Sequence, residues 1–213
     1  MPDRGVSATL GIVRTADNGR SHRVVLTGGP GGGKTTAADL LRREVGDKIV
    51  VVPESATLLF GGGFPRSSEH AARRSAQNAI FHVQRGLEDV YSATYPDRVL
   101  LCDRGTVDGA VYWPGSTDEF FETAGTSLEQ ELGRYDRVLF FETAAVGGIS
   151  IEGGNPVRTE DQEQAIALDL ALRELWSQHP NFTLIQHDGS FLKKIFNALT
   201  VLTGVVEDHG SAA

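Results

Sequence analysis

The stretch Gly28-Gly29-Pro30-Gly31-Gly32-Gly33-Lys34-Thr35 decides the fold of this chain. It matches the pattern G-x-x-x-x-G-K-[ST]. Residues 22–27 before it are largely apolar and β-branched, which predicts a buried strand, and residues 36–45 after it carry apolar side chains at helical spacing. A strand, a glycine-rich loop and a helix in this order are the context of a phosphate-binding loop. The alternative is a flexible glycine-rich turn that carries Gly-Lys-Thr by chance.

The residue types of this loop suit a polyphosphate. Glycines let successive backbone N–H groups turn inward around an anion, and the following helix directs its positive end at the same place. Lys34 is expected to reach the β- and γ-phosphates, and the Thr35 hydroxyl to ligate Mg²⁺. We therefore predict a nucleoside triphosphate, ATP with GTP as a possibility, held with Mg²⁺ by Gly29, Pro30, Gly31, Gly32, Gly33, Lys34, Thr35 and Thr36.

The composition is that of one globular α/β domain. The 213 residues are 40% hydrophobic and 23% charged, and the formal net charge is −8. This charge disfavours broad binding of nucleic acid or of anionic membranes, and no apolar run approaches the ~20 residues of a membrane span. The single cysteine, Cys102, fits a reducing compartment, and the scattered histidines show no zinc-ligand spacing. We expect a cytoplasmic monomer or homodimer without nucleic-acid or stable membrane association.

Hydrophobic runs divide the chain into alternating strands and helices. Further buried strands are predicted at residues 48–52, 98–102, 137–141 and 182–186. Helices are predicted at 55–59, 67–95, 160–178 and 191–202, with two or three short ones between 108 and 133. Residues 1–20 are interpreted as a flexible arm, 21–204 as one domain, and 205–213 as a tail.

Acidic residues follow two of these strands, at the sheet edge where ligands of open α/β proteins bind. Glu54 is a candidate general base, with a helix N-cap as the alternative. Asp103 is a candidate Mg²⁺ ligand or second candidate base, and the adjacent Arg104 could bind phosphate bidentately. Cys102 is interpreted as a buried core thiol rather than a nucleophile.

The long helix at 67–95 offers two faces. Its apolar stripe comprises Ala72, Ala76, Ile80, Val83, Leu87 and Val90. Beside it Gln77, Phe81 and Gln84 form a narrow face that could hold a hydroxylated substrate, or could pack against another helix. Arg74 is a candidate substrate ligand, and with Arg66 and Arg73 it is an ordinary surface charge unless the acceptor is anionic. Tyr112 and Trp113 are candidate walls of the acceptor site or core residues.

Residues 143–158 contain two glycine pairs and are predicted to form a mobile lid. Arg158 ends this segment, and it is expected to stabilise charge on the γ-phosphate. The alternative is a surface arginine near an acidic helix start. Asp188, in the loop after the fifth strand, is a candidate contact for the nucleotide base.

These residues resemble P-loop kinase-like proteins grouped around the ribosylnicotinamide kinase domain and the TRPL translocation defect proteins. The likeness covers about residues 22–203 and rests on the phosphate loop, Val52-Pro53-Glu54, Thr57-Leu58-Leu59 with Gly61-Gly62, residues 77–84, and Asp103-Arg104-Gly105. It implies a nucleoside/nucleotide-kinase-like three-layer sandwich with a five-stranded parallel sheet in the order 2-3-1-4-5, helices on both faces and a mobile lid. Right-handed β-α-β crossovers agree with that arrangement. Such chains are often labelled AAA ATPases, but this chain lacks the features of a ring motor.

Two functions follow from these observations. The first is a kinase that transfers the γ-phosphoryl group of ATP to a hydroxyl of a nucleoside-like molecule or other metabolite, with Lys34, Glu54, Asp103, Arg104 and Arg158 as catalytic residues. Nucleotide hydrolysis is its fallback activity. The second is a nucleotide-dependent binding switch without an acceptor. The guanine-reading signature Asn-Lys-x-Asp is absent from the sequence, which weakens an ordinary GTPase.

Overall fold

A computed structural model describes residues 21–147, 162–187 and 190–210. The strands are β1 (Arg23–Thr27), β2 (Ile49–Val52), β3 (Val99–Asp103), β4 (Arg137–Phe141) and β5 (Phe182–Ile185). The α-helices are α1 (Lys34–Val45), α2 (Ser55–Gly61), α3 (His70–Thr94), α4 (Gly109–Tyr112), α5 (Thr117–Thr123), α6 (Leu128–Leu132), α7 (Gln162–Trp176) and α8 (Phe191–Gly210). Three 3₁₀ turns, η1 (Gly46–Lys48), η2 (Thr106–Asp108) and η3 (Ala144–Gly147), complete the described elements.

The five strands form one parallel sheet in the order β2-β3-β1-β4-β5. The predicted strand order is therefore confirmed. β1 is central and pairs with β3 through Val25 opposite Cys102, and with β4 through Val25 opposite Val138. Because all strands are parallel, their carboxyl ends meet at one edge, where the phosphate loop follows β1.

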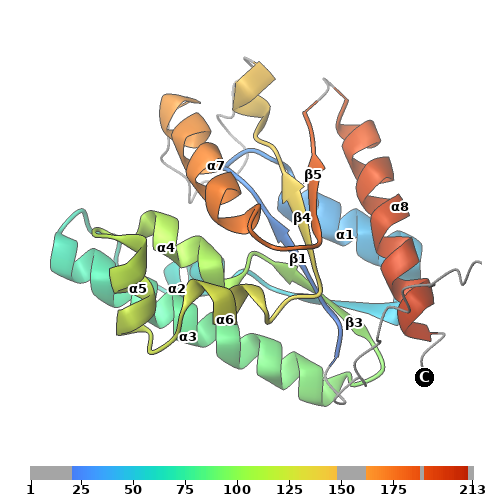
Figure 1. Ribbon diagram of the computed structural model, residues 1–213, viewed down its shortest axis with the longest axis horizontal. Helices are drawn as coiled ribbons and strands as arrows, with labels where there is room; N and C mark the ends of the chain where they lie inside the picture. Colours follow the sequence, from blue (N-terminus) through green and yellow to red (C-terminus); the bar gives the residue numbers. More distant parts are fainter. Residues whose placement is uncertain (1–20, 148–161, 188–189, 211–213) are drawn as a thin grey trace, which may run out of the picture.

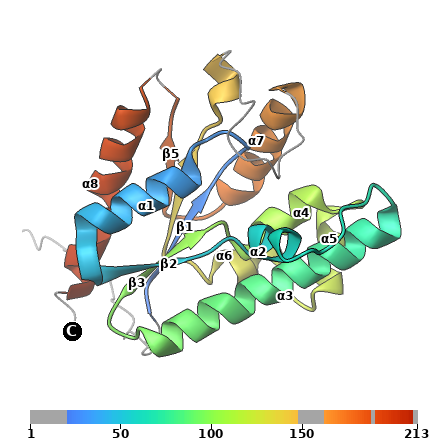
Figure 2. The same cartoon turned by 180° about the vertical axis from the view of Figure 1, so that it is seen from behind.

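Helices cover both faces of the sheet and bury two separate apolar layers (Figures 1 and 2). Val24 and Leu26 of β1 face α1 and α8, whereas Val25 faces the side of α3 and α7. Side chains alternate between the faces of a strand, so the consecutive apolar residues of β1 contribute to both layers. The short helices α4, α5 and α6 lie beside α3 on the second face (Figure 1).

The buried face of α3 differs from the predicted apolar stripe. Val90 is 62% exposed, whereas Phe81, Gln84 and Glu88 are buried. The helix turns Glu88 inward because this carboxylate accepts hydrogen bonds from the Tyr135 hydroxyl at 2.7 Å and from Arg134 at 2.8 Å, and also pairs with Arg23. A buried carboxylate is stable only with such partners, and they come from distant parts of the chain.

The predicted tail is wrong as far as residue 210, because α8 continues to Gly210. Val205 and Val206 are buried in the layer between the sheet, α1 and α8, so their burial extends the helix past Gly204. The predicted arm (1–20), residues 148–158 of the predicted lid, and residues 211–213 lie outside the described residues. Within the described ranges, no helix has the length and apolar character needed to span a bilayer.

Candidate functional site

The glycines of the phosphate loop are required by its conformation and by its close neighbours. Gly31 and Gly33 have φ angles of 76° and 82°, in the left-handed region that favours glycine. A Cβ on Gly32 would lie 2.7 Å from the carbonyl oxygen of Phe141, and one on Gly33 would lie 2.5 Å from the Phe191 ring. At these two positions the loop therefore has no space for a side chain.

Lys34 and Thr35 stand at the start of α1, where the predicted chemistry requires them. The Lys34 ammonium is buried inside the loop and donates to the carbonyl oxygens of Gly28 and Gly29, each at 2.7 Å. Thr35 and Thr36 are exposed at the first turn of α1. The Thr35 hydroxyl donates to Asp103 Oδ2 at 2.8 Å. A hydroxyl and a carboxylate are oxygen ligands of the kind that Mg²⁺ prefers, so this pair fits the ion.

Burial raises the pKa of Asp103 above its usual value, and the nearby charge of Glu54 raises it further. Lys34, Arg104 and the Thr35 hydroxyl oppose this shift without cancelling it. The Asp103 and Glu54 carboxylates, which follow neighbouring strands, therefore interact electrostatically.

Asp169 on α7 is a support of the phosphate loop that the sequence analysis missed. Its Oδ1 accepts the backbone N–H of Gly29 at 2.8 Å and that of Thr143 at 3.0 Å. The Thr143 hydroxyl in turn donates to the carbonyl oxygen of Pro30. Burial raises the pKa of Asp169, although both N–H donors act against the increase. The first residue of the predicted lid is therefore tied directly to the phosphate loop. An acid within the apolar run 165–172 was the only sequence signal for it.

A second polar chain joins Glu54 to the interior. Arg104 Nε lies 2.6 Å from Glu54 Oε1, and its Nη1 lies 2.7 Å from Asp108 Oδ2. Asp108, which the sequence analysis did not select, also accepts from the Thr27 hydroxyl at 2.8 Å and from the Trp176 indole at 2.7 Å. Burial alone lowers the pKa of Arg104, but Tyr112, Glu54 and Asp108 outweigh this effect and raise it well above its usual value.

The contacts of Glu54 do not include the helix-capping hydrogen bond that one of its two interpretations expects. It occupies the N-cap position of α2, but its side chain makes no capping hydrogen bond to the backbone. It instead pairs with Arg104 and accepts from the Thr57 hydroxyl at 2.6 Å. Arg104 and Thr57 therefore hold the carboxylate in place at the carboxyl end of β2.

A cavity of about 230 Å³ lies between the phosphate loop, α2, α3 and the turn into α4. Its lining includes three arginines, two carboxylates, two amides and three aromatic rings: Arg66, Arg73, Arg104, Glu54, Asp108, Gln77, Gln84, Phe60, Phe81 and Tyr112. Pro30 of the phosphate loop also lines it. Its volume lies below the range of roughly 300–1,000 Å³ typical of drug-sized ligands, so it fits a small metabolite.

The narrow face of α3, formed by Gln77, Phe81 and Gln84, lines this cavity, but these side chains differ in how readily they could contact a ligand. Gln84 is 2% exposed; its Oε1 accepts the Ser55 N–H at 3.2 Å, and its Nε2 donates to Glu88 and to the Arg104 carbonyl, each at 3.4 Å. Phe81 packs edge-on against Phe120. Gln77 is half-buried, and its amide makes no hydrogen bond within the described ranges. Gln77 is thus the more available ligand of the two amides.

Arg74, a predicted substrate ligand, does not line the cavity. Its guanidinium pairs with Glu119 and lies 5.0 Å from the centre of the Trp113 ring. Arg73, one residue earlier on the helix, takes the position at the cavity. Tyr112 lines the cavity, whereas Trp113 is buried in the core and donates to Glu119.

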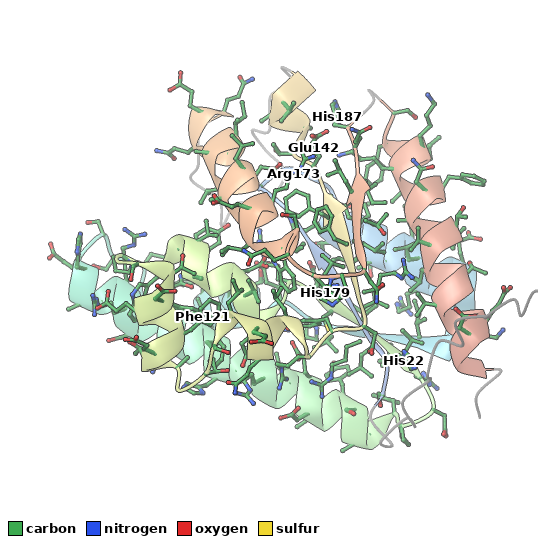
Figure 3. The ribbon with its side chains drawn as sticks, viewed as in Figure 1. His22, Phe121, Glu142, Arg173, His179 and His187 are labelled. Carbon is green, nitrogen blue, oxygen red and sulfur yellow. The ribbon has the colours of Figure 1, made fainter. Side chains whose placement is uncertain are left out.

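On the other side of the phosphate loop, Glu142, Arg173 and His187 gather at the carboxyl ends of β4 and β5 (Figure 3). Glu142 Oε2 accepts the His187 N–H at 2.8 Å, and its Oε1 lies 3.8 Å from Arg173. His22 and His179 lie at the opposite end of the sheet. Arg158 and Asp188, predicted to contact the γ-phosphate and the base, lie outside the described residues.

Fold and loop together define a P-loop nucleotide-binding domain. The chain belongs to the AAA domain family, which it matches over residues 23–193. No curated protein matches it. Among solved structures, shikimate kinase from Acinetobacter baumannii in complex with shikimate is similar, with 16% identity, a TM-score of 0.51, and coverage of 88% of this chain and 94% of that one. At this identity the likeness shows the fold alone.

Proposed function

We propose that this protein is an ATP- and Mg²⁺-dependent kinase that phosphorylates a hydroxyl of a small metabolite. The observation that carries the proposal is the cavity beside the phosphate loop, because Pro30 of the loop and Glu54 line the same space. A phosphoryl donor on the loop and an acceptor in the cavity would meet at Glu54. Positioning of the two reactants supplies most of the acceleration expected of a phosphoryl-transfer enzyme.

Each residue has a role in this reaction. The acceptor oxygen forms a bond to the γ-phosphorus, the bond to the leaving oxygen of ADP breaks, and the hydroxyl proton passes to the Glu54 carboxylate. Lys34 stabilises the charge on the phosphates, and Arg104 fixes the orientation of Glu54 through their 2.6 Å ion pair. Thr35 and Asp103 would hold Mg²⁺, which neutralises phosphate charge when bound.

A metal at this position takes most of its ligands from phosphate oxygens and water. Among the residues that the structure describes, no cluster of three or more His, Cys, Asp or Glu side chains able to hold a metal occurs. The lid arginine, Arg158, is proposed to complete the charge stabilisation when the lid closes.

The test measures ADP release from ATP and Mg²⁺ in the presence of nucleosides, sugars, sugar phosphates, polyols and sugar acids. We expect one class to stimulate ADP release and to become phosphorylated. Lys34→Ala should abolish this activity and remove thermal stabilisation by ATP and Mg²⁺ while the fold remains, since its ammonium contacts the loop rather than the apolar core.

Equal stabilisation of Lys34→Ala and the parent by nucleotide would contradict nucleotide binding at this loop. Hydrolysis without stimulation by any acceptor, together with a partner protein that binds only the triphosphate form, would contradict the kinase and support the binding switch.

A further inference from the structure

The cavity beside the phosphate loop carries more positive charge than the reaction itself requires. Arg104 is neutralised by its two carboxylate partners, Glu54 and Asp108. The other two arginines of the lining, Arg66 and Arg73, form no ion pair with a carboxylate in the part of the chain that the structure describes. Two guanidinium groups thus face the same small cavity without an anionic partner.

The contacts of Arg66 and Arg73 position their side chains but do not neutralise their positive charge. Arg66 lies over the Phe60 ring, with its guanidinium carbon 4.0 Å from the ring centre. Arg73 Nη2 donates to the carbonyl oxygen of Tyr112 at 2.9 Å. A ring face and a carbonyl are neutral groups, so neither balances the charge of a guanidinium. The neighbouring Arg74, by contrast, is paired with Glu119 outside the cavity.

The two ends of the cavity differ in chemistry. Gln84 lies at one end, where its amide oxygen accepts the N–H of Ser55, the residue after Glu54. Arg73 lies about three helical turns earlier on α3, next to the loop that carries Arg66. A proton acceptor therefore stands at one end, and a pair of guanidinium groups at the other.

We propose that the acceptor is a hydroxylated oxyanion, a phosphate monoester or carboxylic acid, whose anionic group binds Arg66 and Arg73 while its hydroxyl faces Glu54. This inference rests on the proposed kinase function and names its substrate class. The planar fork of arginine matches both phosphate and carboxylate bidentately, so the two share one recognition chemistry. Binding of the anion at the far end holds the hydroxyl in the position for transfer.

A binding experiment tests the charge of the site without knowledge of the acceptor. The protein is first saturated with a non-hydrolysable ATP analogue and Mg²⁺, so that the phosphate loop is occupied, and inorganic sulfate is then titrated by calorimetry. We expect sulfate to bind the parent, and each of Arg66→Gln and Arg73→Gln to weaken it about tenfold. Arg73→Lys should restore part of the loss, since it keeps the charge but lacks the fork.

Arg43→Gln is the matched control, because it removes one guanidinium from an exposed position in the last turn of α1. It should leave sulfate affinity unchanged. Failure of sulfate to bind the parent, or equal binding by the parent and an Arg66→Gln/Arg73→Gln double variant, would overturn the inference.

A kinetic experiment with matched acceptors separates this inference from the proposed function. Sugars and polyols are compared with the corresponding sugar phosphates and sugar acids, and ADP release is measured. Stimulation by the phosphate or the carboxylate series, with a KM that rises in the double variant and a kcat that changes little, supports the inference and identifies the anion. Preferential use of neutral acceptors, unaffected in the double variant, would overturn the anionic class and leave the kinase standing. ADP release unaffected by every one of these compounds would overturn the anionic class, and failure of the nucleosides as well would overturn the kinase.

Discussion

Gln84 offers a direct test of whether a cavity residue binds substrate or holds the site together. The sequence allows a substrate ligand or a packing contact, and the structure shows an amide whose three hydrogen bonds join α2, α3 and the end of β3. In Gln84→Ala the buried N–H of Ser55 loses its acceptor, which costs about 1–3 kcal/mol. The two bonds at 3.4 Å are weaker and add about 1 kcal/mol together with the lost packing. We expect a loss of roughly 2–4 kcal/mol in the free energy of unfolding.

The assay is denaturant unfolding followed by tryptophan fluorescence, with Gln77→Ala as the matched control on the same face of α3. Because Gln77 makes no hydrogen bond within the described ranges, its replacement should change the free energy of unfolding by less than about 0.5 kcal/mol. It should instead raise the KM for the acceptor. Gln84→Met, which restores volume but not hydrogen bonds, should retain most of the destabilisation.

The opposite pattern would refute this reasoning. If Gln84→Ala unfolds like the parent but raises the acceptor KM, then the amide binds substrate and does not hold the site together.

Three further predictions concern the phosphate side of the site. Glu54→Gln should slow transfer by about 10²-fold. It should also lower the pH at which Mg²⁺-dependent nucleotide affinity is lost, because Asp103 cannot bind the ion once it is protonated. Removal of the neighbouring negative charge lowers the raised pKa of Asp103 toward 3.8. If nucleotide affinity is measured against pH and its midpoint in Glu54→Gln is equal to or higher than in the parent, then Glu54 and Asp103 are not coupled. Asp169→Ala should destabilise the protein by about 2 kcal/mol or more, because two buried N–H groups lose their acceptor, whereas Asp169→Asn keeps an accepting oxygen and should cost much less; equal thermal unfolding of both variants would exclude this role. Arg158→Ala should lower turnover far more than nucleotide affinity in steady-state and equilibrium measurements, and a loss of affinity alone would assign it to ground-state binding.

Local sequence was sufficient to predict the individual strands and the phosphate loop. Runs such as Val99-Leu100-Leu101-Cys102 have few alternatives to a buried strand, and the glycine pattern of the loop is a direct consequence of its backbone geometry. The core position of Cys102 is likewise confirmed, and burial raises the pKa of its thiol. The strand order came from the resemblance to P-loop kinase-like proteins.

Polar groups that are buried by distant partners could not be predicted. The inward face of α3 depends on Glu88, whose partners Arg23 and Arg134 lie far away in the sequence, so an apolar-stripe argument placed Val90 inside instead. Asp108 and Asp169 were missed for the same reason. Arg73 and Arg74 are adjacent in sequence, and only the position of Glu119 in the fold separates their roles.

The supports of the phosphate loop bear on when this protein can first bind nucleotide during its synthesis. The loop is made early, but its backbone rests on Phe141, on Asp169 and on the ring of Phe191, which all follow much later in the chain. β1 likewise gains neighbours only after residues 99–103 and 137–141 have left the ribosome. A ribosome-bound chain that exposes residues up to 160 should therefore not retain ATP, however complete its glycine-rich motif. Nucleotide can stabilise the finished domain, but it cannot guide the earlier steps of its folding.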